Sequence, residues 1–389
     1  MRKVLIDNCV PLNNGDAALI FGLYKQLKEK KFDIEFSCLK KEEVEKVYPN
    51  YKWHSSHINT LFYRICFKKN LLVFLWKFFI FIKLTVFNNE YKSNDIIISA
   101  PGGYIHSYYG IEARMYILYL CKKWLHKQVG IYSQSIGHLN KRDQKILYKY
   151  GQYLDFIFVR DEVSYKRIKS YGDFNNISLT KDAAFLLLDK DLQAKNISGK
   201  KVALSVRKWN HEGRNMQTYY HLLHKIVEYL LKNNYEITFL STCQGISGYT
   251  DDSETAEDFL RKYNYKQGKN IKIDKKYYDL EALQKEIRTF DFVIGTRLHM
   301  CLLSLINGVP SFNISYEEKG AESFNYLNIE TFTVDFNSTP EDLTEKLQMF
   351  LTMDLIEKEK IMEKVRDISK EQKLIFYDLY SSNFERKAP

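Results

Sequence analysis

The 389-residue chain is poor in the residues that mark disordered or fibrous proteins, with only 6 prolines and 17 glycines. This scarcity argues against long disordered or collagen-like segments. Its 6 cysteines are scattered and form no C-x-x-C pair, so we expect buried, reduced thiols rather than a disulfide framework. The N-terminus, MRKVLIDNCV, has too short an apolar run for a signal peptide, and we interpret it as a first buried strand.

Long uncharged apolar runs are also missing. The most apolar stretch, from Leu71 to Phe87, is interrupted by Lys77 and Lys83, which argues against a membrane-spanning helix. It lies within residues 51–92, which hold seven Lys or Arg, one Glu and twelve aromatic residues. Two interpretations remain open. The segment is either a basic amphipathic helix on an anionic membrane surface, or a helix packed on a sheet with its lysines extending to solvent.

Several sequence signatures are absent as well. There is no HExxH motif, EF-hand loop, GxGxxG turn, P-loop or GxSxG elbow, so we expect no metal or other cofactor. The formal net charge of +10 fits an anionic small substrate, a membrane surface or nucleic acid. Because the charge is spread along the chain and no nucleic-acid motif is visible, we expect no nucleic-acid partner.

Short apolar runs alternate with amphipathic helices, which favours an α/β fold with parallel sheets. Strands are predicted at residues 3–10, 33–39, 95–103, 128–137, 155–161, 201–207, 235–242, 270–276, 291–296 and 310–315. Helices are predicted at 16–30, 112–127, 141–154, 216–234 and within 340–380. A polar stretch at 189–200 interrupts the pattern and indicates a linker. We therefore predict two doubly wound domains, 1–190 and 191–389, with a ligand cleft between them.

The segment GTRLHMCLLSLINGV, residues 295–309, follows a predicted strand and has helical spacing. With Thr296 as the N-cap, Arg297 and His299 fall in the first turn, where unpaired N–H groups favour an anion. A cation is normally disfavoured there, so both residues make sense beside an anionic ligand. Alternatively, Arg297 pairs with a structural carboxylate and His299 is an ordinary core histidine.

Two other cations follow strand ends. Arg207 comes directly after a predicted strand, and its planar guanidinium matches a carboxylate or a phosphate. Lys208 and Arg214 lie nearby and could share that role. Lys319 follows a later strand, where a surface lysine is the alternative interpretation.

In the first half of the chain, three turns after strands are candidate ligand contacts. PLNNGDAALI contains Asn14 and Asp16, although Asp16 could serve only as a helix N-cap. SAPGGYIH contains Gly102 and Gly103, and YSQSIGH contains Gln134.

Eight of these pieces occur in a characteristic order: NNGDAAL, APGGYIH, SQSIG, VRDEVSYKRIKSYG, KDAAFLL, LSVRKW, TRLHMCLLSLINGVP and ISYEEKG. Together they span residues 13–320 and resemble the polysaccharide pyruvyl transferase family. The chain departs from the family pattern in two places. Its first Gly-rich turn has two glycines instead of three, and residues 51–92 match no family motif.

The resemblance implies two Rossmann-like domains of glycosyltransferase-B type, with the active site in the interdomain cleft. It also implies transfer of a pyruvyl group from phosphoenolpyruvate, as co-substrate, to a hydroxyl pair of a sugar, forming a cyclic ketal. The acceptor would be a bacterial-type surface polysaccharide or its lipid-linked precursor. The C-terminal domain would bind the donor through Arg207, Arg297, Leu298 (by its backbone) and His299, with Lys319 as a neighbour. The N-terminal domain would bind the acceptor, through Asn14, Asp16, Gly102, Gly103 and Gln134.

We assign His299 the role of general acid, base or both, because a histidine beside anions titrates near neutral pH. We expect a cytoplasmic enzyme, with peripheral attachment to the inner membrane face left open, and a final helix that packs back on the N-terminal domain. One alternative function is a nucleotide-sugar-dependent glycosyltransferase of the same fold. Another is a non-catalytic protein that binds nucleic acid or anionic glycan.

Overall fold

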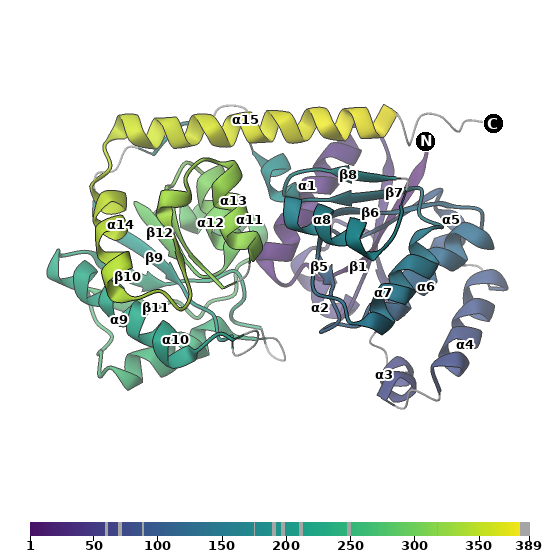
Figure 1. The fold of residues 1–389 in the computed structure, drawn as a ribbon, viewed down its shortest axis with the longest axis horizontal. Helices are drawn as coiled ribbons and strands as arrows, with labels where there is room; N and C mark the ends of the chain where they lie inside the picture. The colour runs from purple at the N-terminus through teal and green to yellow at the C-terminus, as the bar shows by residue number, and fades with distance from the viewer. Residues whose placement is uncertain are drawn as a thin grey trace. The chain divides into compact units, whose positions relative to one another are not determined.

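The computed structural model describes residues 1–58, 61–68, 72–87, 89–174, 176–188, 192–195, 199–209, 213–246, 250–316 and 318–381. The chain divides into two compact units near Leu186, with two exceptions. Leu12–Ala18 belongs to the second unit, and the chain from Gln372 onward belongs to the first. The helices α1 (Asn14–Glu29) and α15 (Leu355–Tyr380) therefore contribute residues to both units (Figure 1).

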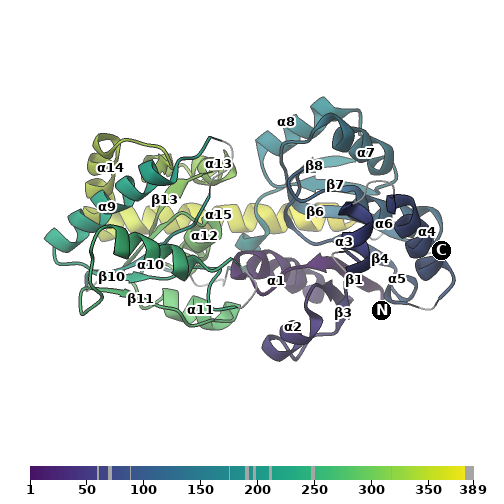
Figure 2. The ribbon, with the colours of Figure 1, turned by 90° about the horizontal axis from the view of Figure 1, so that it is seen from below.

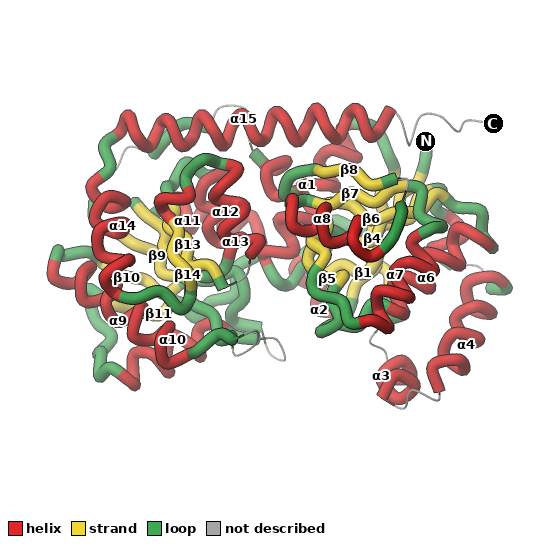
Figure 3. Tube along the Cα trace, in the orientation of Figure 1, coloured by secondary structure: helices red, strands yellow, loops and turns green. Residues whose placement is uncertain are grey.

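The first unit is built on a parallel sheet in the order β3-β2-β1-β4-β6-β7-β8, with β5 paired to β6. Its strands are β1 (Lys3–Cys9), β2 (Asp33–Cys38), β3 (Trp53–Ser55), β4 (Ile96–Ser99), β5 (Gly102–Ile105), β6 (Gln128–Ile136), β7 (Phe156–Val159) and β8 (Ile177–Leu179). The residues of β4, β6 and β7 are all buried, as expected for parallel strands covered on both faces. Helices flank this sheet (Figure 3).

Those helices are α2 (Lys41–Val47), α3 (Leu61–Lys68), α4 (Val73–Thr85), α5 (Glu90–Ser93), α6 (Glu112–Lys123), α7 (Lys141–Gly151) and α8 (Glu162–Tyr171), followed by the 3-10 helix η2 (Ala183–Leu187). Side chains cap three of them: Asn89 accepts hydrogen bonds from the Tyr91 and Lys92 N–H groups at α5. Asn140 accepts one from the Asp143 N–H at α7, and Asp161 accepts one from the Ser164 N–H at α8. Residues 51–92 are not one helix but contain β3, α3, α4 and the start of α5.

The second unit has a parallel sheet in the order β11-β10-β9-β12-β13-β14. Its strands are β9 (Lys201–Ser205), β10 (Glu236–Phe239), β11 (Ile271–Ile273), β12 (Phe292–Gly295), β13 (Ser311–Ser315) and β14 (Thr333–Asp335). The strand order reverses at β9, which lies between β10 and β12 (Figure 1). On the other side of β10 lies the edge strand β11 (Figure 2). Ligands of doubly wound sheets bind at the carboxyl ends of the strands beside such a reversal.

The second unit's helices are α9 (Met216–Lys232), α10 (Asp252–Lys262), α11 (Leu280–Ile287), α12 (Leu298–Ile306), α13 (Glu318–Tyr326) and α14 (Pro340–Thr352), with the 3-10 helix η3 (Glu330–Phe332) before β14. Every residue of α12 is buried except His299, which is half-buried. This central helix therefore brings one titratable side chain to the edge of an apolar core.

The predicted strands and helices are present, but four short strands were missed: β3, β5, β8 and β14. Half of the predicted linker at 189–200, namely 189–191 and 196–198, lies outside the described residues, and β9 begins directly after it. All six cysteines are buried free thiols. In the part of the chain that the structure describes, no helix has the length and apolarity needed to cross a membrane.

The end of α15 is anchored in the first unit by Gln372. Its Nε2 donates to the Tyr132 hydroxyl at 3.0 Å, and its Oε1 accepts from the Lys181 N–H at 2.7 Å. The amide is fully buried, so both hydrogen bonds satisfy groups that solvent does not reach.

Candidate functional site

Arg207 follows β9 at the carboxyl edge of the second sheet. Its guanidinium carbon lies 4.4 Å from the ring centre of Trp209 and 4.5 Å from that of Tyr316. Its Nη1 also donates to the Tyr316 hydroxyl. A guanidinium held over two aromatic rings has a fixed plane, so this cation is oriented in advance of any ligand.

Tyr316 is itself braced by Arg214. The Arg214 Nε donates to the Tyr316 carbonyl at 2.9 Å, and its Nη1 lies 2.6 Å and 2.7 Å from the two carboxylate oxygens of Asp335. These bonds engage Arg214 in positioning Tyr316, and a ligand-binding role shared with Arg207 stays a prediction. Lys208 is exposed.

Arg297 forms a buried ion pair with Asp252. Its Nε and Nη2 each lie 2.7 Å from an oxygen of the Asp252 carboxylate, and the two side chains are 10% and 0% exposed. Burial by itself lowers the pKa of Arg297, but the carboxylate outweighs burial and raises the pKa above its usual value. Arg297 is therefore charged at every working pH. These bonds use two of the five N–H donors of a guanidinium.

The Asp252 carboxylate also belongs to a chain of hydrogen bonds that links the carboxyl ends of β10 and β9. Oδ2 of Asp252 accepts a hydrogen bond from the Ser241 hydroxyl at 2.5 Å, and the Ser241 Oγ lies 3.1 Å from the Ser205 Oγ. Asp252 is not among the site residues predicted from the sequence. Its acidic neighbour Asp251 is a typical N-cap, which would have indicated a helix start, but no local pattern links Asp252 to Arg297.

The start of α12 differs from the prediction. Arg297, not Thr296, is the N-cap, and within the described residues no side-chain hydrogen bond caps this helix. The Thr296 hydroxyl instead lies 2.7 Å from the Tyr219 hydroxyl, which also accepts a 3.4 Å hydrogen bond from the Arg207 N–H. Because the side chain of its N-cap residue makes no capping hydrogen bond, the N-terminal end of α12 offers a favourable site for an anion.

His299 lies against the first turn of α1. A Cβ built on Gly15 would be 3.0 Å from Nδ1 and 3.1 Å from Cβ of His299, closer than ordinary contact. Because glycine has no Cβ, position 15 leaves space for the imidazole of His299. The predicted N-cap Asp16 is wrong, because α1 begins at Asn14 and the Asn13 side chain accepts from the Gly15 N–H at 3.0 Å.

Asn14 attaches this turn to the second unit. Its N–H donates to the Thr242 carbonyl at 2.9 Å, and its Nδ2 donates to the Tyr278 carbonyl at 2.8 Å. The side chain is buried, and its Oδ1 has no hydrogen-bond partner. Sequence analysis assigned Asn14 and Asp16 to the N-terminal domain, whereas the structure groups both with Arg297 and His299.

The charged side chains of this site act on the pKa of the Cys243 thiol. Burial is the main cause that raises its pKa, to about 11, and the charges of Arg297, Asp252, Asp16 and Arg207 also act on it. Charged side chains from four distant parts of the chain therefore influence one buried thiol. Within the described residues, no three His, Cys, Asp or Glu side chains are placed to share a metal ion.

The remaining candidates lie elsewhere or outside the described side chains. Gly102, which has a φ of 149°, pairs with Gln134 across β5 and β6 in the first unit, and Gly103 follows it. The Gln134 Nε2 donates to the Ala100 carbonyl, and its buried Oε1 has no partner. Lys319 lies in the first turn of α13, but its side chain is outside the described part of the structure.

The fold is shared with solved sugar-processing enzymes. A glycosyltransferase from Rickettsia africae has a TM-score of 0.62 at 10% identity, with 99% of each chain covered. A UDP-GlcNAc 2-epimerase from Methanocaldococcus jannaschii has a TM-score of 0.58 at 13% identity, covering 97% of this chain and 100% of that one. The chain is therefore an α/β protein of two Rossmann-like domains, of the glycosyltransferase-B type.

The chain belongs to the polysaccharide pyruvyl transferase family, whose sequence profile matches residues 13–318. A curated relative is the amylovoran biosynthesis protein AmsJ of Erwinia amylovora, 23% identical over 379 residues, or 87% of this chain and 89% of that protein. The resemblance drawn from the ordered motifs is confirmed. Membership identifies the protein as a transferase of polysaccharide biosynthesis.

Proposed function

We propose that this protein transfers a pyruvyl group from phosphoenolpyruvate to two hydroxyls of a sugar, forming a cyclic ketal in a surface polysaccharide or its lipid-linked precursor. The observation that carries the proposal is the start of α12. There, a helix without a side-chain cap presents Arg297 and His299, with the oriented guanidinium of Arg207 at the same sheet edge. Family membership supports the same reaction class.

Phosphoenolpyruvate carries a phosphate and a carboxylate on a three-carbon frame, so it needs two anion-binding groups a short distance apart. In the proposed complex the phosphate lies at the N–H groups of Leu298 and His299, and receives hydrogen bonds from the Arg297 donors that Asp252 does not use. Arg207 binds the carboxylate through its planar fork. Lys319, in the first turn of α13, remains a proposed neighbour of the donor.

His299 delivers a proton to the methylene carbon of phosphoenolpyruvate, which becomes the methyl group of the ketal. The adjacent carbon then accepts the first sugar hydroxyl, and its bond to the phosphate oxygen breaks. The second hydroxyl adds to the same carbon and closes the ring. The two hydroxyls release two protons, of which one restores His299 and the other leaves with phosphate. A positioned acid of this kind contributes about 10²- to 10⁴-fold to the rate.

For the acceptor, we propose contacts from Asn14 and Asp16, because their turn adjoins His299 in the second unit. The Asp16 carboxylate can accept a hydrogen bond from a sugar hydroxyl. Gly102, Gly103 and Gln134 remain proposed acceptor contacts of the first unit.

The test is to incubate the protein with phosphoenolpyruvate and a panel of lipid-linked and aryl glycosides, measuring phosphate release and the mass gain of a pyruvate ketal. We expect both products with wild type and neither with His299→Ala. A His299→Ala protein that folds and turns over at the wild-type rate would disprove the role of this residue.

Thermal unfolding separates this proposal from a nucleotide-sugar glycosyltransferase. A ligand that binds only the folded state raises the melting temperature as its concentration exceeds its Kd. We expect phosphoenolpyruvate to raise it, and UDP and GDP to leave it unchanged. Stabilisation by UDP or GDP alone would favour the glycosyltransferase.

A further inference from the structure

The helices α3 and α4 of the first unit are apolar on two opposite sides. On one side, α4 buries Val73, Trp76, Ile80 and Leu84, which recur every three or four residues as a core-facing stripe should. The Trp76 ring packs edge-on against Tyr63 of α3, with ring centres 5.6 Å apart. This side accounts for the stability of α4 within the unit.

The other side of these helices is exposed and also apolar. Its large side chains, each 41–65% exposed, are Phe62, Ile65, Phe74, Leu75, Phe78, Phe79, Val86 and Phe87. We call this surface the α3–α4 apolar face. Its exposure is not explained by the fold, because a solvated helix normally carries polar residues on its outer side. The rings of Phe62 on α3 and Phe79 on α4 lie 5.3 Å apart, so the exposed side chains of the two helices adjoin. An exposed apolar patch of this kind marks an interaction surface.

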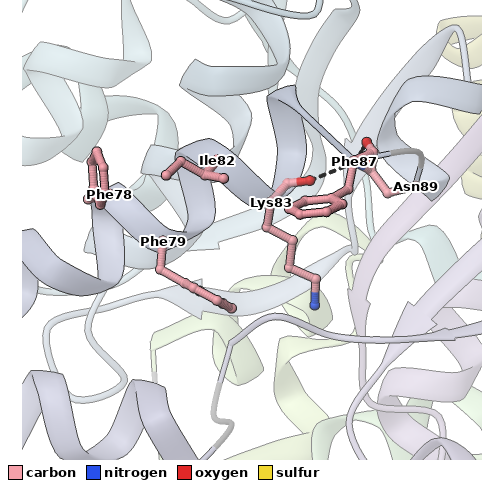
Figure 4. A pocket seen from close by; sticks show the side chains of 6 residues that line it. All are labelled: Phe78, Phe79, Ile82, Lys83, Phe87 and Asn89. Carbon is pink, nitrogen blue, oxygen red and sulfur yellow. Dashed lines mark hydrogen bonds between the residues drawn. The ribbon is translucent and has the colours of Figure 1, made fainter.

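The C-terminal half of α4 lines a hollow in the surface. Six residues line a hollow of about 370 Å³: Phe78, Phe79, Ile82, Lys83, Phe87 and Asn89. Figure 4 shows their side chains. Asn89 fixes the end of the hollow, because Nδ2 donates to the carbonyls of Phe87 at 2.8 Å and of Lys83 and Leu84 at 3.1 Å. The hollow is therefore a shaped apolar feature with a single cation on its lining.

A second hollow of about 450 Å³ is strongly basic. It is lined by Lys77, Glu112, Lys141, Arg142, Lys145, Ile146, Lys149 and Tyr150. Glu112, its one carboxylate, is already paired with Lys77 at 2.5 Å and Arg142 at 2.6 Å. Lys141, Lys145 and Lys149 follow one another at helical spacing along α7 and are exposed; we call them the α7 basic stripe.

The two features belong to one region of the first unit. α6 packs against both α4 and α7, and Lys77 of α4 reaches into the basic hollow to meet Glu112 of α6. The ring of Phe81 on α4 also lies 5.0 Å from that of Trp124, an exposed residue at the end of α6. Aromatic side chains and lysines therefore lie near one another on α4, α6 and α7.

We propose that the α3–α4 apolar face and the α7 basic stripe together dock this protein on the anionic surface of a lipid bilayer. Aromatic side chains beside exposed lysines match the boundary between acyl chains and anionic headgroups. No helix in the described residues is suited to crossing the bilayer, so the attachment is peripheral. A second copy of the chain fits less well, because a symmetric contact would bring two basic stripes together.

This proposal does not depend on pyruvyl transfer, and vesicle flotation tests it directly. The full-length protein is mixed with vesicles of phosphatidylcholine alone or with phosphatidylglycerol added, at low and high salt. We expect binding to the anionic vesicles, with weakening at high salt because exposed charges are screened. A wild-type protein that floats with neither vesicle overturns the proposal.

Two matched pairs of variants locate the surface. Each lysine near an anionic surface contributes about a fivefold increase in affinity, so K141Q/K145Q/K149Q is expected to bind about a hundredfold more weakly. Its control neutralises three exposed lysines of the second unit, Lys266, Lys269 and Lys272. The apolar variant F74S/F78S is compared with I356S/L374S on α15, whose side chains are equally exposed.

Binding is expected to fall in both first-unit variants and to stay at the wild-type level in both controls. Thermal unfolding and stabilisation by phosphoenolpyruvate should be unchanged in all four proteins, so that a loss of vesicle binding is not a loss of fold. Equal losses in the controls would overturn the proposal. So would light scattering that shows a wild-type dimer which F74S/F78S dissociates, because the apolar face would then be a dimer interface.

Discussion

Arg297 and Asp252, from the starts of α12 and α10, form a two-pronged ion pair with both nitrogen–oxygen distances at 2.7 Å. The pair fixes the guanidinium at the N-cap of α12, beside the half-buried His299. The ion pair also limits which N–H donors of Arg297 are available to a ligand. One edge of the guanidinium is occupied by Asp252, so a ligand can use only the remaining N–H donors.

Replacing Asp252 with Asn should destabilise the protein, because it leaves a buried Arg297 without its counter-charge. Removal of one partner from a buried pair costs about 3–5 kcal/mol. Urea unfolding measures this loss, and stabilisation by phosphoenolpyruvate should fall with it. The control is Asp251→Asn, since Asn is as good an N-cap as Asp and should change stability little. Equal stability of the two variants would contradict the structural role of the pair.

Arg207→Lys should weaken donor binding while keeping the positive charge. Lysine cannot lie flat over the Trp209 and Tyr316 rings or bind a carboxylate through two parallel hydrogen bonds. The expected result is an increase of about tenfold or more in the KM for phosphoenolpyruvate, with little change in unfolding temperature. Lys208→Gln, at the exposed neighbouring position, should leave KM unchanged. An unaltered KM in Arg207→Lys would exclude Arg207 from the donor site.

Gly15→Ala should slow turnover without unfolding the protein. The added Cβ would sit 3.0 Å from the Nδ1 of His299 and push the imidazole away, although alanine is about 1 kcal/mol better than glycine in a helix. We expect a lower kcat and an unchanged or higher melting temperature. In a His299→Ala background the same substitution should have no further effect on kcat. An additive loss in the double variant would show that Gly15 acts independently of His299.

Glu35 should make stability depend on pH in the acid range. Burial by itself raises its pKa, but hydrogen bonds from Lys52 at 2.5 Å, His54 at 2.8 Å and Asn94 at 3.2 Å outweigh burial and hold the pKa below its usual 4.5. A carboxyl whose pKa is lowered by folding contributes stability above its unfolded pKa. That contribution is lost as the pH falls through the folded value.

The measurement is the melting temperature of wild type and Glu35→Gln from neutral pH to below pH 4. Wild type should be the more stable protein at neutral pH, and the difference should shrink below about pH 4.5. Glu42→Gln, at an exposed position of α2, serves as the control and should follow wild type throughout. A constant difference between wild type and Glu35→Gln would refute the linkage.

Features set by local spacing were predictable from the sequence. The strand at 201–207 follows from a short continuous apolar run, and the helix around Leu302 from apolar residues three and four positions apart; they appear as β9 and α12. The ordered motifs identified the family for the same reason, since each is a short continuous stretch. Local capping was less predictable. Thr296 and Asp16 have the chemistry of N-caps, but neither caps its helix. The Thr296 hydroxyl pairs with that of Tyr219, and at α1 the Asn13 side chain accepts the Gly15 N–H.

The sequence by itself determined the two doubly wound units, the family and the position of Arg297 and His299 at a helix start. Only the tertiary structure decided that Asp252 occupies one edge of Arg297, and that the turn containing Gly15 belongs with His299. The reason is physical. Periodicity and turn chemistry act between residues a few positions apart, whereas an ion pair or a steric contact depends on distances in space, which folding sets between segments far apart in the chain.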